Sequence, residues 1–413
     1  MRKPILIFMM LQAFMGQSFA QTDPIIKSWQ RNTTGATGYN GITCNVQLVQ
    51  YSASWVYVSC TGIPSYTIGP WASNPNVATN QNFVFKFPRT PQANSGTLTT
   101  VGLGHIGVWT NGVSIFNPDD GMTYNNAGVW HRNAYYFEKV SFDACLGHPQ
   151  QQGEYHHHIN PTCIYNDTDA SHHSPIIGWA MDGFPVYGAF AYTNTDGTGP
   201  IKRMQSSYQL RNITSRTTLP DGSTASSAGP AISTQYPLGC FIQDYVYTQG
   251  SGDLDAHNGR FCKTPDFPNG IYAYFVTIDA ARTPIYPFVL GDTYYGVVPT
   301  GSTGPTSGHT TISESTTTYT GTASGILNQA PVASFKLAPN PVNTSLNLFI
   351  DATNQNDLTA TIVNSIGQPI RSISLLQPAV SYSFDCRALP NGWYMLRLGS
   401  GNHSSEKAFI VQH

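Results

Sequence analysis

The sequence of 413 residues has few charged side chains, which make up 10% of it, whereas soluble proteins average about 25%. Its net charge of -2 offers no basic surface, so we expect neither nucleic acid nor an anionic membrane as a partner. Gly, Thr, Ser, Asn and Tyr replace the usual helix formers, which favours strands and turns. The hydrophobic share of 40% is large enough to build a core and argues against a disordered chain.

Beyond its first twenty residues, the chain has no apolar run long enough to span a membrane. It begins with Arg2 and Lys3, continues with an apolar stretch over residues 4–15, and reaches small residues at Ser18 and Ala20. This order is typical of a secretory signal peptide. The apolar stretch is shorter than the ~20 residues that a membrane-spanning helix needs. We therefore predict a signal peptide over residues 1–20 and a mature chain without a transmembrane segment.

The sequence also lacks any C-x-x-C pair, which argues against a thiolate metal site. All seven cysteines follow Ala20, and an oxidising compartment permits disulfides. Six of them lie before residue 300, and spacing alone leaves their connectivity open, because six cysteines allow about fifteen pairings. We expect each to pair with its neighbour in sequence and Cys386 to be a buried free thiol. The expected pairs are Cys44 with Cys60, Cys145 with Cys163, and Cys240 with Cys262.

Composition divides the mature chain into three segments. Residues 21–298 are dense in aromatic residues and turn signals, and alternating runs at 54–59, 82–87 and 272–277 predict strands. We expect a large Tyr- and Gly-rich β-domain there, with few short helices; residues 134–140 fit either a short helix or a strand. Residues 299–331 are rich in Ser, Thr and Gly, which predicts a flexible linker, with a final exposed strand as the alternative.

The last segment, residues 332–413, contains short strand-like runs at regular spacing, which predict a small β-sandwich. These runs cover 345–350, 360–363, 369–373, 393–398 and 407–411. The fold class that the whole sequence indicates is therefore mainly β. A plain adhesion-type sandwich is one interpretation of this segment.

Three motifs in this segment carry a more specific signal, at Leu337–Pro341, Val363–Gln368 and Leu389–Tyr394. In this order they resemble the C-terminal sorting domain of the type IX secretion system of Bacteroidetes. The resemblance implies that the type IX secretion machinery is a partner and that the protein is exported across both membranes. It also implies removal of the domain, followed by release or attachment at the outer-membrane surface. The sequence departs from the family at Ala338, where a bulky residue is common, and at the ending Val411–His413, where a basic residue is usual.

The densest polar chemistry lies between residues 143 and 188. Side chains alternate faces along a strand, so His156 and His158 are expected to point the same way, with Tyr155 and His157 on the other side. His148 lies eight residues before His156. A disulfide between the cysteines at 145 and 163 would close a loop that holds all three candidate ligands.

Three neutral imidazoles suit Zn or Cu, and also Ni or Fe. The predicted metal ligands are therefore His148, His156 and His158. Asp182, in an Asp-Gly turn, is the fourth candidate, either as a ligand or as a carboxylate that orients a ligating imidazole. The H-x-H pattern lacks the glutamate of a cupin ligand set, so we do not expect a cupin fold.

Four motifs in order resemble the YHYH domain family over about residues 55–298. They begin with Tyr155–His158, where His157 replaces the second tyrosine of the family name, and continue over 172–188, 253–260 and 264–275. The motif positions that we single out are Tyr155, His157, Asp182, Gly183, Tyr187, Asp255, Asn258 and Arg260. That family has no established activity, so the resemblance implies a related fold and no particular reaction.

Three functional hypotheses follow. The first is an extracellular metal-binding domain. The second is a non-catalytic surface module that binds glycan or protein through exposed aromatic residues. The third is a structural protein whose His/Tyr network only fills the core. Separately, we expect His172 and His173 to be exposed in a polar loop. The chain lacks a nucleophile elbow, a P-loop, an H-E-x-x-H motif and a dinucleotide fingerprint, so we assign no enzyme class.

Overall fold

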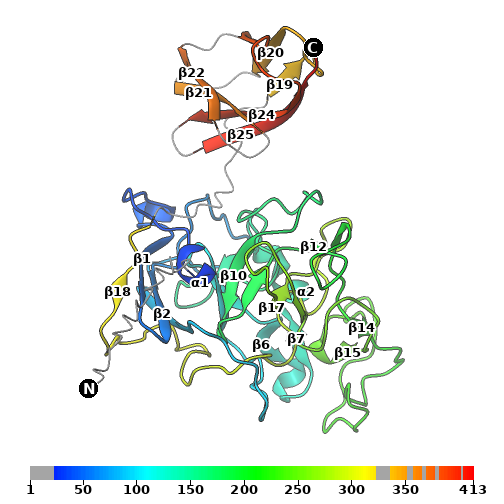
Figure 1. The fold of residues 1–413 in the computed structure, drawn as a ribbon. Helices are drawn as coiled ribbons and strands as arrows, with labels where there is room; N and C mark the ends of the chain where they lie inside the picture. The colour runs from blue at the N-terminus through cyan, green and yellow to red at the C-terminus, as the bar shows by residue number, and fades with distance from the viewer. Residues whose placement is uncertain (1–22, 322–334, 351–356, 365–368, 377–380, 401–402) are drawn as a thin grey trace, which may run out of the picture. The chain divides into compact units, whose positions relative to one another are not determined.

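The computed structural model describes residues 23–321, 335–350, 357–364, 369–376, 381–400 and 403–413. The protein is mainly β, as its composition predicts. It forms two compact units, and the boundary between them in the sequence is near residue 325 (Figure 1). The predicted signal peptide lies outside the described residues. Within the described ranges, no helix is both long and apolar enough to cross a membrane.

The largest sheet of the first unit has eight strands in the order β16-β17-β11-β10-β4-β5-β9-β8. Its neighbours are antiparallel except for the parallel pairs β11–β17 and β5–β9. Every residue of β4 and β10 is buried, which explains why these strands show no alternation of apolar and polar residues. The strands are β4 (His105–Trp109), β5 (Ser114–Phe116), β8 (His148–Pro149), β9 (Tyr155–His157), β10 (Ile176–Ala180), β11 (Pro185–Tyr187), β16 (Gly259–Cys262) and β17 (Ile271–Phe275).

A second, antiparallel sheet has the order β18-β1-β2-β3, with β1 (Val46–Tyr51), β2 (Trp55–Cys60) and β3 (Phe83–Pro88). Strands β2, β3 and β17 confirm the three strands predicted for this domain. Phe83 and Phe85 of β3 are buried, and both rings lie 5.1 Å from the ring of His105 on β4. The two sheets therefore share a core.

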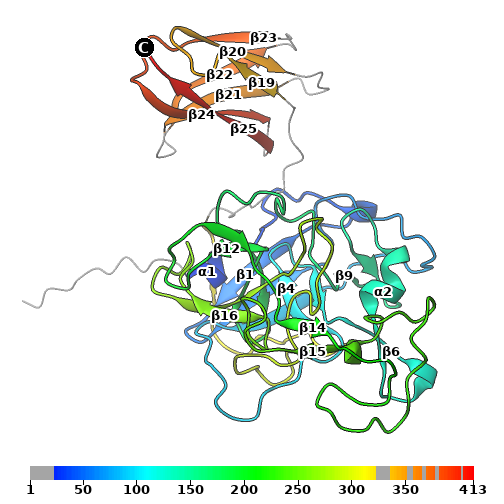
Figure 2. The same cartoon turned by 90° about the vertical axis from the view of Figure 1, so that its right-hand side faces the viewer.

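Short elements complete the first unit. Residues 134–140, which fitted helix or strand, form the helix α2 (Ala134–Glu138) and the 3-10 turn η3 (Lys139–Ser141) (Figure 2). Asn133 caps α2, because its side chain accepts a hydrogen bond from the backbone of Tyr135. The other elements are α1 (Pro24–Lys27), η1 (Tyr39–Gly41), β6 (Asp119–Thr123), η2 (Tyr124–Asn126), β7 (His131–Asn133), β12 (Phe190–Tyr192), β13 (Ile201–Arg203), β14 (Tyr208–Leu210), η4 (Ile242–Asp244) and β15 (Tyr245–Tyr247).

The predicted flexible linker is wrong for residues 299–321, which pack against the first unit. Strand β18 (Thr317–Thr318) pairs with β1, so the alternative of a final exposed strand is the correct one here. Tyr57 donates a hydrogen bond of 2.6 Å to Glu314, and Arg31 donates one of 2.6 Å to the carbonyl of Gly321. The amino-acid composition of a segment reflects the hydrophobicity of its side chains. It does not indicate whether the backbone of that segment pairs with the edge of a sheet. Residues 322–331 lie outside the described part of the chain.

One of the three expected disulfides is present, between Cys145 and Cys163. The other two expected pairs are wrong, because Cys44, Cys60, Cys240 and Cys262 are all free and buried. Two of these thiols donate hydrogen bonds to different carbonyl groups, that of Cys44 to Ala36 and that of Cys60 to Gly112. Cys386 is buried and free, as predicted.

The thiol count gives a direct test. Denatured in the absence of reductant, the full chain, which still carries Cys386 of the sorting domain, is expected to expose five alkylatable thiols by mass spectrometry, and seven after reduction. A count of one would mean that the rejected pairs form in solution.

The Cys145→Ser/Cys163→Ser variant should lose about 3 kcal/mol in free energy of unfolding, because the bond closes a loop of roughly 15 to 20 residues.

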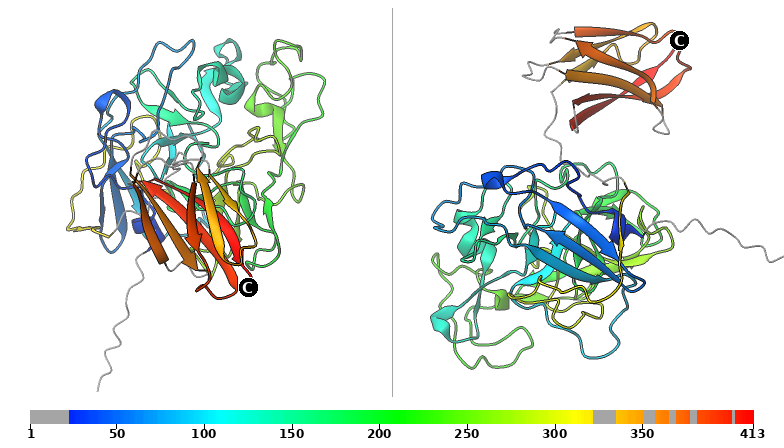
Figure 3. Two further views of the ribbon diagram at one scale, coloured as in Figure 1. Left: turned by 90° about the horizontal axis from the view of Figure 1, so that it is seen from above. Right: turned by 90° about the vertical axis from the view of Figure 1, so that its left-hand side faces the viewer.

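The second unit is a small β-sandwich, as predicted (Figure 3). A three-stranded antiparallel sheet, β19-β20-β23, faces a four-stranded antiparallel sheet, β22-β21-β24-β25. Leu346 and Leu348 from the first sheet join Ile362, Leu396 and Phe409 from the second in one core. The strands are β19 (Phe335–Ala338), β20 (Ser345–Ile350), β21 (Asp357–Asn364), β22 (Pro369–Leu376), β23 (Ser381–Asp385), β24 (Gly392–Ser400) and β25 (His403–Val411).

Candidate metal centre

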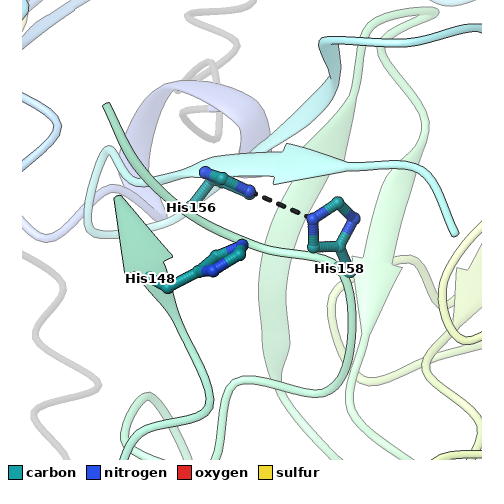
Figure 4. A group of neighbouring side chains, drawn as sticks. All are labelled: His148, His156 and His158. Atoms are coloured by element: carbon teal, nitrogen blue, oxygen red, sulfur yellow. Dashed lines mark hydrogen bonds between the residues drawn. The ribbon is translucent and has the colours of Figure 1, made fainter. Parts of the chain in front are cut away.

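A tight β-hairpin places two of the predicted ligands side by side. Strands β8 and β9 are antiparallel, and their register sets His148 opposite His156. Directly opposed residues present their side chains on the same face of a sheet. The connecting turn includes Gly153 at φ +80°, a conformation that residues with a side chain rarely adopt. His158 follows His156 by two residues, so all three imidazoles meet (Figure 4).

The three rings are buried and close enough to share one ion. The Nε2 atoms of His156 and His158 lie 3.1 Å apart. One ligand nitrogen from each of the three histidines lies within 4.8 Å of the others. Three nitrogens with these separations lie within about 2.8 Å of one common point. Zn–N bonds are shorter, at about 2.0–2.1 Å. A small inward movement of the rings would thus complete the coordination.

Hydrogen bonds fix which nitrogen of each ring carries the proton. The Nδ1 atoms of His156 and His158 lie 3.2 and 2.5 Å from the carbonyl oxygens of Glu154 and Asn117. A carbonyl can only accept, so both Nδ1 atoms donate, and each neutral ring has its lone pair on Nε2. These are the outer hydrogen bonds that metal-ligating histidines ordinarily make.

His148 has the same tautomer for a related reason. Its Nδ1 lies 2.7 Å from Oγ of Ser141, whose hydroxyl donates to the backbone carbonyl of Glu138 at 2.8 Å. A hydroxyl has a single proton, so Ser141 must accept from His148. All three Nε2 lone pairs are therefore available to the cluster. Two lone pairs 3.1 Å apart repel each other unless a cation, either a proton or a metal ion, lies between them.

Glu138 at the end of α2 completes the cluster, and no pattern in the sequence had indicated this residue as part of the site. Its Oε2 lies 3.2 Å from Nε2 of His158 and 3.7 Å from Nε2 of His148. No motif marks this residue, because it belongs to a separate helix whose secondary structure the sequence left ambiguous. Only the packing of α2 against the hairpin brings it to the histidines.

Burial and the Glu138 charge set the protonation of the cluster. Burial lowers the pKa of His148 to about 4 and holds the pKa of His156 well below its usual value. Burial would also lower the pKa of His158, but the Glu138 carboxylate outweighs it and raises that pKa. Burial alone would raise the pKa of Glu138, yet the neighbouring histidines lower it. His148 and His156 are therefore neutral at pH 7, as metal ligands must be.

The cluster forms part of the wall of a pocket of about 460 Å³. Acidic residues Asp119, Asp120 and Glu138 share this wall with the three histidines. Phe116 stacks on His156 with 4.0 Å between ring centroids, so one side of the cluster is apolar. A small polar molecule in the pocket would reach the imidazoles directly.

Tyr155 and His157 lie on the opposite face of β9, which confirms the predicted alternation. Their ring centroids are 5.2 Å apart, and the Tyr155 hydroxyl donates to Asp143 at 3.2 Å. Burial lowers the pKa of His157 to about 3. This side of the strand is a buried hydrogen-bonded network rather than a part of the candidate centre.

The structure does not bring Asp182 to the cluster. Its Oδ2 accepts hydrogen bonds from the Tyr274 hydroxyl at 2.6 Å and from the backbone of Gly296 at 2.9 Å. The Nδ1 atoms of the three histidines have other partners, so Asp182 neither ligates nor orients them. The adjacent Gly183 has φ +84°, and a Cβ there would meet Pro88. The Asp-Gly pair is a structural turn, and sequence could not reveal which neighbours that turn faces.

The remaining motif residues tie strands together. The Tyr187 hydroxyl lies 2.8 Å from that of Thr264, and Asp255 accepts from the Tyr272 hydroxyl at 2.8 Å. Asn258 donates to two backbone carbonyl groups, and Arg260 donates to the carbonyl of Tyr192. These residues hold β11, β16 and β17 in place.

The two histidines of the polar loop differ. His172 is exposed, as expected, with 66% of its side chain accessible. His173 is buried, contrary to expectation, because its ring packs edge-on against that of Tyr187 at 4.9 Å. Its Nδ1 also lies 2.7 Å from the carbonyl of Ser174.

The fold and site define a mainly β protein with a buried cluster of three histidines. Residues 84–287 match the YHYH protein family, and residues 336–412 match the secretion system C-terminal sorting domain. The chain thus carries a YHYH domain, which contains the histidine cluster, followed by a sorting domain. The sorting domain indicates secretion to the cell surface or beyond. No curated protein matches this sequence.

Proposed function

We propose that the YHYH domain binds one transition-metal ion through the Nε2 atoms of His148, His156 and His158. The observation that carries this proposal is the convergence of three Nε2 lone pairs, two of them 3.1 Å apart. Every Nδ1 has an acceptor, so each ring is oriented before an ion arrives. Imidazole ligands suit Zn and Cu.

Elemental analysis of the purified mature chain tests the proposal. Wild type is expected to retain about one Zn or Cu per chain, and the His156→Ala/His158→Ala variant less than a tenth of that, because a single remaining imidazole binds weakly. His173→Ala is the matched control, since it removes a buried histidine outside the cluster. Equal and negligible metal in wild type and the double variant would refute the proposal.

A purely structural role is the second candidate. It is favoured by the ion pair of His158 with Glu138, in which a proton takes the place of the metal ion. In that case His156→Ala lowers the melting temperature, and neither added metal nor a chelator changes the difference. The metal proposal requires the wild-type melting temperature to respond to both.

We further propose that the type IX machinery carries out the export, after which the sorting domain is removed. The match over residues 336–412 supports this proposal. Mass spectrometry of the secreted protein should then find no peptides from this region.

Glycan binding by the exported domain remains a prediction, which a glycan array would test.

A further inference from the structure

We infer that Glu138 is the fourth protein ligand of this ion, so that the centre is a set of three histidines and one glutamate. This inference rests on the proposed metal-binding function. It adds a residue that no motif marks, and it changes the kind of ion and chemistry that the centre supports.

The distances between the polar atoms of the cluster fit a shared ion. Neighbouring ligand atoms that share a tetrahedral or octahedral ion with bonds of about 2.0–2.2 Å lie about 2.8–3.6 Å apart. Oε2 of Glu138 is 3.2 Å from Nε2 of His158, and that nitrogen is 3.1 Å from Nε2 of His156. The distance from Oε2 to Nε2 of His148 is 3.7 Å, slightly longer than this range. The carboxylate oxygen therefore lies where a fourth ligand belongs.

Two buried polar atoms of the cluster lack well-formed hydrogen bonds. Among the described residues, Oε2 of Glu138 and Nε2 of His148 are both buried and lack a hydrogen bond of acceptable geometry, although Oε2 also lies at the ion-pair distance of 3.2 Å from Nε2 of His158. Buried polar atoms are nearly always satisfied, because leaving one unpaired forfeits its hydration. These two atoms lie 3.7 Å apart, and one cation bound to both would satisfy them.

Hydrogen bonds connect α2 and η3 to the β8–β9 hairpin. The backbone carbonyl of Glu138 accepts the Ser141 hydroxyl proton, and Ser141 in turn accepts from Nδ1 of His148. One short segment thus supplies a carboxylate to the centre and orients one of its imidazoles. The Asn133 cap fixes the start of that helix.

A carboxylate beside three imidazoles makes the ligand set harder. Such a set suits Zn²⁺, Mn²⁺ or Fe²⁺ and disfavours Cu⁺, which prefers sulfur ligands. The four residues all line the same pocket, so an ion with five or six ligands would present its remaining positions to that pocket. A small anion such as azide is expected to bind there.

Titration of the metal-free mature chain with Co²⁺, followed by visible absorption, tests this inference. Glu138→Gln is expected to bind Co²⁺ 10- to 100-fold more weakly than wild type and to show a different d–d spectrum, because a neutral amide is a poor ligand. Asp119→Asn is the matched control, since it neutralises another carboxylate of the same pocket and should preserve affinity and spectrum. Glu138→Asp keeps the charge but shortens the side chain, and it should also alter the spectrum.

The outcomes separate the two proposals. Wild-type affinity and spectrum in Glu138→Gln would overturn the role of Glu138, while loss of Co²⁺ from His156→Ala/His158→Ala would still support the histidine site. Failure of wild type to bind Co²⁺, Zn²⁺ or Mn²⁺ would overturn both. If Glu138→Gln does not fold, a wild-type spectrum in Glu138→Asp would equally reject the ligand role.

Discussion

Adding Zn²⁺ to the metal-free protein is expected to raise the free energy of unfolding of the YHYH domain by about 4 kcal/mol, at a free ion concentration 1,000 times the dissociation constant. The physical reason is linkage, since the proposed ligands come from α2, β8, β9 and the residue after β9, and they converge only in the folded chain. Denaturant unfolding with Zn²⁺ and with a chelator measures this difference.

The His156→Ala/His158→Ala variant should lose the entire Zn²⁺-dependent increase. His173→Ala should lower stability with and without Zn²⁺ alike, because it removes a buried ring but no ligand. An equal response to Zn²⁺ in wild type and the double variant would place the ion elsewhere on the chain.

Asp244→Ala is expected to lower the free energy of unfolding by about 3–5 kcal/mol. Arg216 and Asp244 form a bidentate ion pair at 2.8 Å for both contacts, and both side chains are fully buried. Removing the carboxylate would leave the guanidinium buried without a counter-charge. Asp244 also accepts hydrogen bonds from the backbone of Gly239 and Phe241, so the loop before β15 would lose its anchor.

Lys202→Ala provides the comparison. Lys202 pairs with Asp253 at 2.5 Å, but 38% of its side chain is exposed, so its loss should cost no more than about 1 kcal/mol. Denaturant unfolding of both variants measures the contrast. A cost for Asp244→Ala within the range of the exposed pair would show that the buried pair adds no particular stability.

Local periodicity was enough to predict part of the candidate site. The two-residue spacing of His156 and His158 on a strand fixed their common face, and the alternation placed His157 behind them. Sequence proximity also suggested His148, but the register of β8 with β9 was needed to set it opposite His156. Asp182 failed as a ligand and Glu138 was missed for one reason: each depends on packing between elements distant in sequence.

The disulfides and the linker show the same limit. Neighbouring cysteines were the natural pairs, yet only Cys145 and Cys163 are bonded. The thiols of Cys44 and Cys60 instead donate hydrogen bonds to separate carbonyl groups. The Ser/Thr-rich segment before residue 321 looked flexible, but its backbone pairs with β1. Side-chain composition does not record the hydrogen bonds that the main chain makes.

The sequence by itself determined the motifs of the sorting domain, the mainly β architecture, the terminal sandwich and the histidine-rich strand, because each depends on local composition, periodicity or motif order. The tertiary structure alone decided that three imidazoles and the Glu138 carboxylate meet beside one pocket. That meeting requires a helix, a hairpin and a strand register to be set together, and such long-range contacts leave no local pattern in the chain.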